Sequence, residues 1–214
     1  MTRHTRGIVA MSIALSVSHD LSTGLTYAIV HGYSELQQAF IGEQIKSMAS
    51  LARHPLLLPI LFTAHMQRLL SVQRRQLWTQ LLRAETASGQ TGVPAVNGHL
   101  FSPQTPNFDT ITKRVLGIMQ CASAWITHSN ALLLGIDAIQ ESVDYITSTS
   151  SDSRKDPSAK TTDTLKEWLD LVRHKSKVML WDFEFFDKRA QAQMTAVISL
   201  SRRVIYFCTW LTDL

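Results

Sequence analysis

The chain has 214 residues, 45% of them hydrophobic, and a mean hydropathy of zero. This length suits one large domain or two small ones, and the composition excludes both a disordered tail and a polytopic membrane protein. The net charge of +4 is unevenly spread, because residues 1–136 carry ten Lys/Arg against five Asp/Glu, whereas residues 137–214 carry eleven against twelve. Such a balance permits binding to nucleic acid or anionic lipid without requiring it.

Two apolar runs near the N-terminus predict a β-hairpin. Residues 8–17 are rich in β-branched and apolar side chains, residues 18–24 have turn chemistry, and residues 25–32 form the second run. The start of the chain resembles a weak signal peptide, but a buried strand explains the short, serine-interrupted apolar run better. Because a lone hairpin is marginal in water, we expect it to pack on another element.

The apolar spacing then changes to that of helices. Ser34 is the expected N-cap of a first helix, whose apolar residues recur from Leu36 to Ala52. The segment HPLLLP at residues 54–59 breaks this helix, and a second helix is expected from about Pro59 to Ala87. Residues 88–107 are dense in Gly, Pro, Ser and Asn and predict a long loop.

Two long amphipathic stripes occupy the second half of the chain. Apolar residues keep a 3–4 spacing over about residues 108–148, where Asp109 or Thr110 is the expected cap, and again over about 163–204. A polar segment separates them, so we expect two helices of near-equal length packed antiparallel. The predicted fold is mainly α: a long antiparallel helical hairpin plus shorter helices, with a small N-terminal β-hairpin. We place the β-hairpin and first two helices in residues 1–107 and the helical hairpin in residues 108–214, as parts of one continuous domain.

No motif indicates a reaction. The segment ASGQTGVP at residues 87–94 has two glycines of a phosphate loop, but no Lys-Ser/Thr follows and a helix precedes it. Cys121 and Cys208 lie on different predicted helices without metal-binding spacing, which is typical of a reduced intracellular protein. His54 and His65 are separated by two prolines, so we expect capping and surface roles for them. We therefore predict a protein that is not an enzyme, with no catalytic residue, no metal site and no cofactor.

Three carboxylates form a stripe on the third predicted helix. Asp137, Glu141 and Asp144 are spaced i, i+4 and i+7, which places them on one face. Adjacent like charges repel by a few tenths of a kcal/mol per pair, so the stripe could attract a cation or a basic partner. The alternative is a solvated face of a long helix. A second acidic group, Asp182 to Asp187, is a weaker candidate because side chains two residues apart diverge.

A basic stretch precedes this stripe in the chain. Residues 46–84 contain no acid, and Arg68, Arg74 and Arg75 alternate with apolar residues there. Such a helix suits a surface for an anionic partner, either anionic lipid or the acidic stripe of the third helix, and we favour the intramolecular or partner-facing interpretation. Nucleic acid is not expected, because Trp78 is the only aromatic residue near these arginines.

Four segments, made mainly of packing and turn residues, carry a family resemblance. They are LSVSHDLSTGLTYAIVHG, HPLLLPILFTAHMQR, LLRAETASGQTGVP and, most clearly, DKRAQAQMTAVISL. These segments resemble large filamentous-fungal proteins with a CorA-like magnesium-transporter region. The resemblance covers most of the chain and implies a helical cytoplasmic part that leads into a long stalk helix. In that family two membrane helices follow the stalk, with a Gly-Met-Asn signature between them.

The sequence departs from this family after SLSRR. It continues with VIYFCTWLTDL, and no Gly-Met-Asn occurs. Residues 204–211 are too few to span a membrane, which takes about 20 apolar residues, so we expect no pore from this chain and interpret it as a truncated relative or a truncated gene product. We expect the apolar tail to fold back on the domain, to drive self-association or to touch a membrane; its members are Ile205, Phe207, Trp210 and Leu211.

These observations favour a soluble, cytoplasmic helical interaction or scaffold module, similar to the cytoplasmic region of CorA-like transporters and without transport activity. Its expected partners are a second copy or another helical protein. The alternative is a peripheral membrane or transporter-associated subunit that uses the apolar tail, with membrane contact at most peripheral. Liposome flotation with and without residues 204–214 distinguishes the two.

Overall fold

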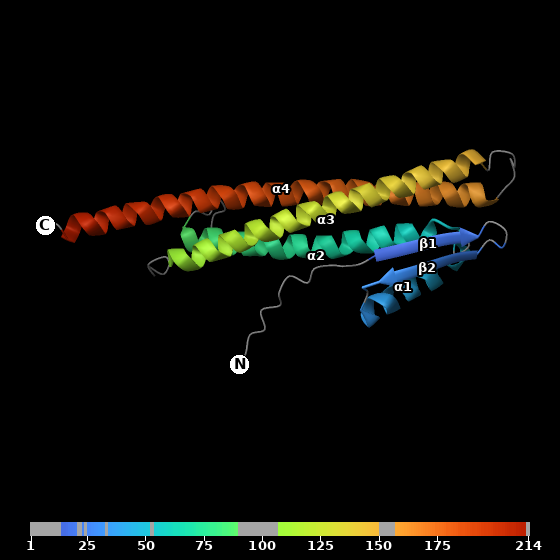
Figure 1. Cartoon of the computed structure of the whole chain (residues 1–214), viewed down its shortest axis with the longest axis horizontal. Coiled ribbons are helices and arrows are strands. Elements are labelled where there is room, and N and C mark those ends of the chain that lie inside the picture. Colours follow the sequence, from blue (N-terminus) through green and yellow to red (C-terminus); the bar gives the residue numbers. More distant parts are fainter. Residues whose placement is uncertain are drawn as a thin grey trace, which may run out of the picture. The chain divides into compact units, whose positions relative to one another are not determined.

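The computed structural model describes residues 14–20, 23, 25–32, 34–51, 54–89, 107–149 and 157–212, with the side chains of 146, 147, 149, 157–159 and 204–212 left out. Figure 1 shows the described elements as ribbons and arrows. In chain order they are the strands β1 (Ala14–Asp20) and β2 (Leu25–His31), the helix α1 (Glu35–Ser47), the short 3-10 helix η1 (Ala49–Leu51), and the helices α2 (Leu57–Ser88), α3 (Phe108–Thr149) and α4 (Pro157–Thr212). The predicted mainly α fold is confirmed.

The chain divides into two compact units. The first consists of Met1–Leu69 and Asn130–Lys177, and the second of Leu70–Ser129 and Val178–Leu214. Each of α2, α3 and α4 contributes one part to each unit. The predicted boundary between residues 107 and 108 divides the chain into two consecutive segments. Each of the two units contains residues from both segments.

The β-hairpin belongs to the first unit. β1 and β2 pair antiparallel from Ala14 opposite His31 to Asp20 opposite Leu25, and Figure 1 shows them as two opposed arrows. Thr23 Oγ1 donates a hydrogen bond of 2.8 Å to Asp20 Oδ2 in the turn. The predicted hairpin is confirmed over these residues, and residues 8–13 of the predicted first run lie outside the described part. No residue of either strand is fully buried.

Local capping fixes the start of α1. The Ser34 side chain accepts from the backbone N–H of Gln37, and the Gln37 side chain accepts from the backbone N–H of Ser34 at 2.9 Å, so the predicted cap forms a reciprocal capping box. The helix ends at Ser47, earlier than the predicted Ala52, because Met48 closes it and η1 follows. No residue of α1 is fully buried.

The long helices begin at residues that local chemistry selects. α2 starts at Leu57, so Pro59 lies inside its first turn, where no N–H is needed. Asn107, rather than the predicted Asp109 or Thr110, caps α3, because its Oδ1 accepts from the N–H of Thr110 at 3.0 Å. α4 begins at Pro157 instead of residue 163, since proline is well suited to the first position of a helix.

α3 and α4 form the predicted antiparallel hairpin, but their lengths are 42 and 56 residues, so the expectation of near-equal length is wrong. Within the first unit, Arg173 on α4 binds Asp137 on α3, and Lys166 binds Asp144, so numbering rises on one helix as it falls on the other. Within the second unit, α2 and α4 run parallel, because Arg74 and Glu85 bind Asp182 and Arg189.

The buried side chains of α3 and α4 follow a seven-residue repeat of alternating steps of three and four residues, which is unbroken on α4 from Thr162 to Val197. This repeat keeps one seam of each helix facing its neighbours, as in a coiled coil. Trp125 and Phe183 are both buried, as the stripes predict. On α4 the seam also takes in three polar residues, Thr162, Ser176 and Gln193, that the sequence did not place there. The buried positions on α4 are Thr162, Leu165, Leu169, Val172, Ser176, Met179, Phe183, Phe186, Ala190, Gln193 and Val197.

Candidate interaction surfaces

The acidic stripe of α3 is largely paired with α4. Asp137 Oδ1 accepts a hydrogen bond of 2.6 Å from the Arg173 guanidinium, and Asp144 lies 3.5 Å from Lys166 Nζ. Cations from α4, and not from the basic stretch of α2 as predicted, therefore cover two of its three members. Pairs as exposed as these contribute up to about 1 kcal/mol each and chiefly help to set the register of the helices.

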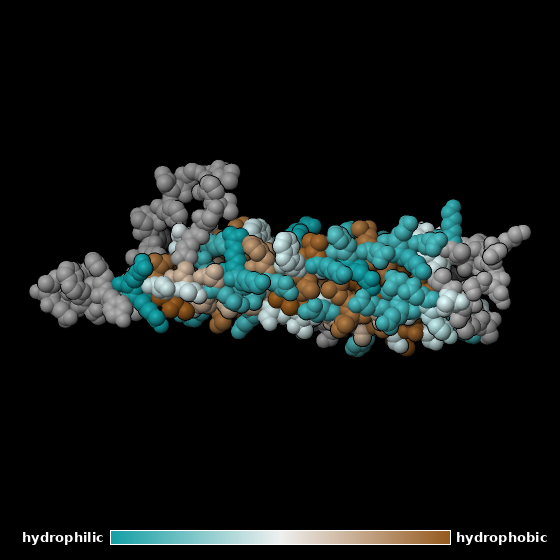
Figure 2. Space-filling view, turned by 90° about the horizontal axis from the view of Figure 1, so that it is seen from above, coloured by the Kyte–Doolittle hydropathy of each residue, from teal (hydrophilic) through white to brown (hydrophobic). Residues whose placement is uncertain are grey.

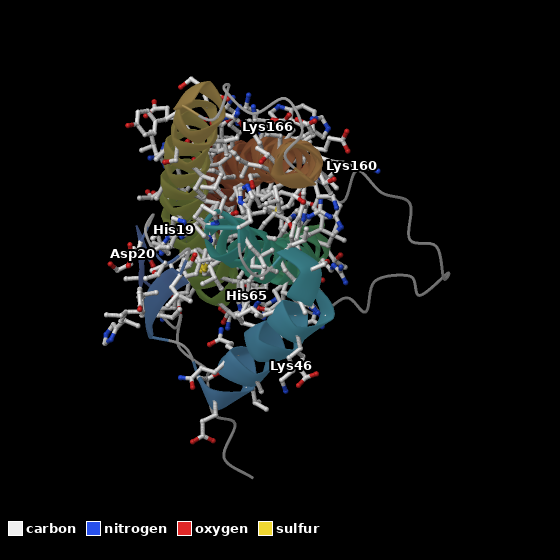
Figure 3. All side chains as sticks on the ribbon, turned by 90° about the vertical axis from the view of Figure 1, so that its right-hand side faces the viewer. His19, Asp20, Lys46, His65, Lys160 and Lys166 are labelled. Atoms are coloured by element: carbon white, nitrogen blue, oxygen red, sulfur yellow. The ribbon has the colours of Figure 1, made fainter. Side chains whose placement is uncertain are left out.

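Glu141, the third member of the stripe, lines a shallow open depression on α3 together with Ala138, Ser142 and Tyr145. Among the residues with described side chains, no group of three or more His, Cys, Asp or Glu residues could hold a metal ion. In Figure 3 the labelled His19 and Asp20 of the first unit lie on the hairpin, His65 on α2 and Lys166 on α4.

The predicted basic surface is divided among separate contacts. The Arg68 guanidinium lies 4.9 Å from the centre of the Phe40 ring in the first unit. In the second unit, Arg74 Nη1 donates to Asp182 Oδ2 at 2.6 Å, while Arg75 is exposed. The Arg74 contact therefore supports the intramolecular interpretation of this stretch for one of its three residues, with α4 as the acidic partner.

Two histidines have structural roles in the first unit. The backbone N–H of Leu56 donates to His54 Nδ1 at 3.3 Å, so the neutral ring carries its proton on Nε2 and donates it to Thr162 Oγ1 at 3.0 Å. Burial, followed by the charge of His19, lowers the pKa of His54 below its ordinary range. The capping role predicted for His54 stays a prediction, because its side chain accepts from the N–H of Leu56, which precedes α2. The surface role is wrong for His65, which is buried against the Phe40 ring.

A buried ion pair that the sequence analysis missed joins α2 and α4 in the second unit. Arg189 donates to both carboxylate oxygens of Glu85, at 2.5 and 2.7 Å, and the Glu85 side chain is only 4% exposed. The same guanidinium lies 5.0 Å from the centre of the Trp78 ring. One turn further on, Gln193 donates to Ser88. A sequence signal was available, because Glu85 is the first acid after the acid-free stretch and follows the buried Leu81 by four residues, which places both on one face of the helix.

α4 also carries a second apolar stripe, which the sequence analysis missed as well. Val178, Trp181 and Phe185 are 41%, 69% and 46% exposed. Their spacing of three and four residues places them on one side of the helix, roughly 130° around the axis from the buried seam that contains Phe183 and Phe186. We call Val178, Trp181 and Phe185 the outer stripe. Figure 2 shows apolar side chains among hydrophilic ones on the face seen from above.

β2 exposes apolar side chains too. Leu25, Tyr27 and Ile29 alternate along the strand and are all exposed, which places them on one face of the hairpin. Their partners on β1 are Asp20, Ser18 and Ser16, so this face has one apolar and one polar row.

The side chains of the predicted tail, Ile205, Phe207, Trp210 and Leu211, lie outside the described residues, so the tail remains a prediction. No helix in the part of the chain that the structure describes is long and apolar enough to cross a membrane. Comparisons with protein-family models, curated proteins and solved structures found no match.

Proposed function

We propose that this protein is a helical interaction module that works as a scaffold and catalyses no reaction. It would correspond to the cytoplasmic helical region of CorA-like transporters, without transport activity of its own. In this proposal an exposed surface on the part of α4 that belongs to the second unit recognises the partner.

The observation that carries the proposal is the outer stripe. A helix at the surface of a folded domain has one apolar face, whereas α4 has the buried seam and, in addition, Val178, Trp181 and Phe185. Trp is the residue type most enriched in interaction hot spots, and it contributes there when it is buried against a partner. A Trp side chain that is 69% exposed, with a Phe one turn away, favours a surface that a partner covers.

The charges beside the outer stripe support a protein partner over a lipid surface. Asp182 and Glu184 interrupt the aromatic residues, and carboxylates next to the stripe would be repelled by anionic lipid. Arg74 already pairs with Asp182 within the chain, so a partner helix would place its cation opposite Glu184. The proposed partner is therefore an amphipathic helix that packs along α4.

Site-specific photo-crosslinking in cells tests the proposal. A photoreactive amino acid replaces Trp181 in one variant and Gln191 in the control, because Gln191 is exposed on the same helix but lies away from the outer stripe. We expect discrete crosslinked protein products from position 181 and none from position 191. Equal labelling at both positions, or no protein product from position 181, would contradict the proposal.

A further inference from the structure

We infer that the partner helix on the outer stripe is α4 of a second copy of this chain, running antiparallel to the first. This inference rests on the proposed function, because it names the occupant of the same surface. It follows from the spacing of the apolar residues and from the charges that flank them.

The apolar residues fit an antiparallel pair. Val178 and Trp181 occupy two successive seam positions of a seven-residue repeat, and Phe185 occupies the next. When two such helices run in opposite directions, each Val178 meets Trp181 of the other copy, and this gives two equivalent layers around a two-fold axis. Each layer then pairs one small residue with one large residue. A parallel pair would instead stack Trp181 on Trp181 and Val178 on Val178, with unequal layers.

One flank of the outer stripe has charges that complement themselves. Lys177 directly precedes Val178, and Glu184 directly precedes Phe185, so the two charges lie seven residues apart on the same side of α4. The structure records no ion pair for either side chain among the residues it describes. In the antiparallel pair, Lys177 of each copy faces Glu184 of the other copy. The dimer therefore has two equivalent Lys177–Glu184 ion pairs.

The opposite flank is already occupied within the chain. Asp182 accepts from Arg74 at 2.6 Å, and Arg189 binds Glu85 through two hydrogen bonds. These contacts hold the two charges toward α2. Among the described residues, the two charges beside the outer stripe that have no ion pair within the chain are therefore Lys177 and Glu184. They can pair with the same two residues of a second copy, so no other protein is required.

The size of the surface predicts the strength of the pair. Two Trp and two Phe side chains of roughly 150–250 Å² each, about half exposed before pairing, supply on the order of 500 Å². A stable specific interface buries about 1,200 Å² or more in total, so the flanking residues must provide the remainder. We expect a reversible dimer with a Kd on the order of 100 μM, which is populated where the chain is concentrated locally.

Charge exchange on the purified full chain tests the pairing and its direction. Sedimentation velocity over roughly 10–500 μM gives the dimer Kd for the parent chain, for Lys177→Glu, for Glu184→Lys and for the double variant. We expect each single change to weaken the dimer about tenfold, because it puts like charges together twice, and the double change to restore it. Trp181→Ala is expected to remove the dimer, and circular dichroism checks that every variant keeps its helices.

Three results would overturn the inference. In a parallel pair Lys177 faces Asp182 and Glu184 faces Arg189, so the double variant would be weaker than either single variant instead of restored. A dimer that Trp181→Ala leaves unchanged would use another surface. A parent chain that stays monomeric throughout would exclude the second copy; the proposed function would then stand or fall on the photo-crosslinking at position 181.

Discussion

Two regions of the molecule differ in how many side chains they bury: the β-hairpin with α1, and the helices α3 and α4. Both regions follow the local sequence rules for strand pairing and helix capping equally well. β1 and β2 pair along seven residues each, and α1 has a complete capping box, yet neither strand nor α1 contains a fully buried residue. α3 and α4 instead bury a side chain at nearly every third or fourth position. Local chemistry therefore determines where elements form, whereas burial determines which of them stabilise the protein.

The largest expected effect is the removal of a core aromatic ring from α4. Phe183→Ala should lower the free energy of unfolding by about 3–5 kcal/mol, since Phe183 is fully buried on the seam, and Trp125→Ala on α3 should act similarly. The matched change in the hairpin, Ile29→Ala at a side chain 73% exposed, should cost less than about 0.5 kcal/mol. Chemical denaturation measures all three. An equal loss of unfolding free energy for Phe183→Ala and Ile29→Ala would show that the two regions do not differ in their contribution to stability.

The next effect concerns the buried ion pair. Arg189→Ala leaves the Glu85 carboxylate buried without its partner, so we expect a loss of about 3 kcal/mol. The control is Lys113→Ala, which breaks the exposed pair with Asp109 on α3 and should cost less than about 0.5 kcal/mol. Thermal and chemical denaturation compare the two variants. A small loss for Arg189→Ala would mean that water reaches Glu85 readily.

A smaller, local effect is expected at the cap of α1. Ser34→Ala removes one half of the capping box and should destabilise the first turn of α1 by about 1 kcal/mol. Because α1 has no fully buried residue, hydrogen exchange should become faster in α1 while the global unfolding midpoint hardly changes. Ser199→Ala on α4 is the control. A large fall in the global midpoint would show that α1 is coupled to the bundle.

The smallest expected effect is a pH dependence of stability that comes from His54, which lies between α1 and α3 in the sequence. Its pKa is lowered in the folded protein, so below about pH 6.5 the unfolded chain binds the extra proton first. Stability should be complete above that pH and decrease as the pH falls toward the folded pKa. Protonation would also remove the acceptor for the Leu56 N–H. Denaturation between pH 5 and 8, in roughly half-unit steps, should show a shallower slope for His54→Asn.

The long helices were predictable because their signal is repeated many times. A stripe that holds its spacing over dozens of residues outweighs any single exception, so most buried positions from Ile111 to Val143 on α3 and from Leu165 to Val197 on α4 lie where the spacing predicts, whereas Met194 is only half-buried. Ends were less accurate, since one residue decides each of them. Asn107 and Pro157 are an N-cap and a first-turn residue, and both lie in polar segments where several residues have similar preferences.

The surfaces were harder to predict, because they depend on residues that are distant in the sequence. Glu85 and Arg189 are 104 residues apart, and no local pattern connects them. The acidic stripe was identified, but its cations on α4 were not, because the partner depends on how α3 and α4 are aligned. The outer stripe was overlooked because Asp182 and Glu184 stand between its aromatic residues, which hides a second helical period from inspection of the sequence.

The seven-residue repeat of α4 also limits how this helix can change in length during evolution. One inserted residue within the seam would rotate every later side chain by about 100°, so the core positions after Phe183 would turn toward solvent. Seven inserted residues would restore the phase and lengthen the helix by about 10 Å. Homologues of this chain should therefore differ in the length of α4 by whole repeats.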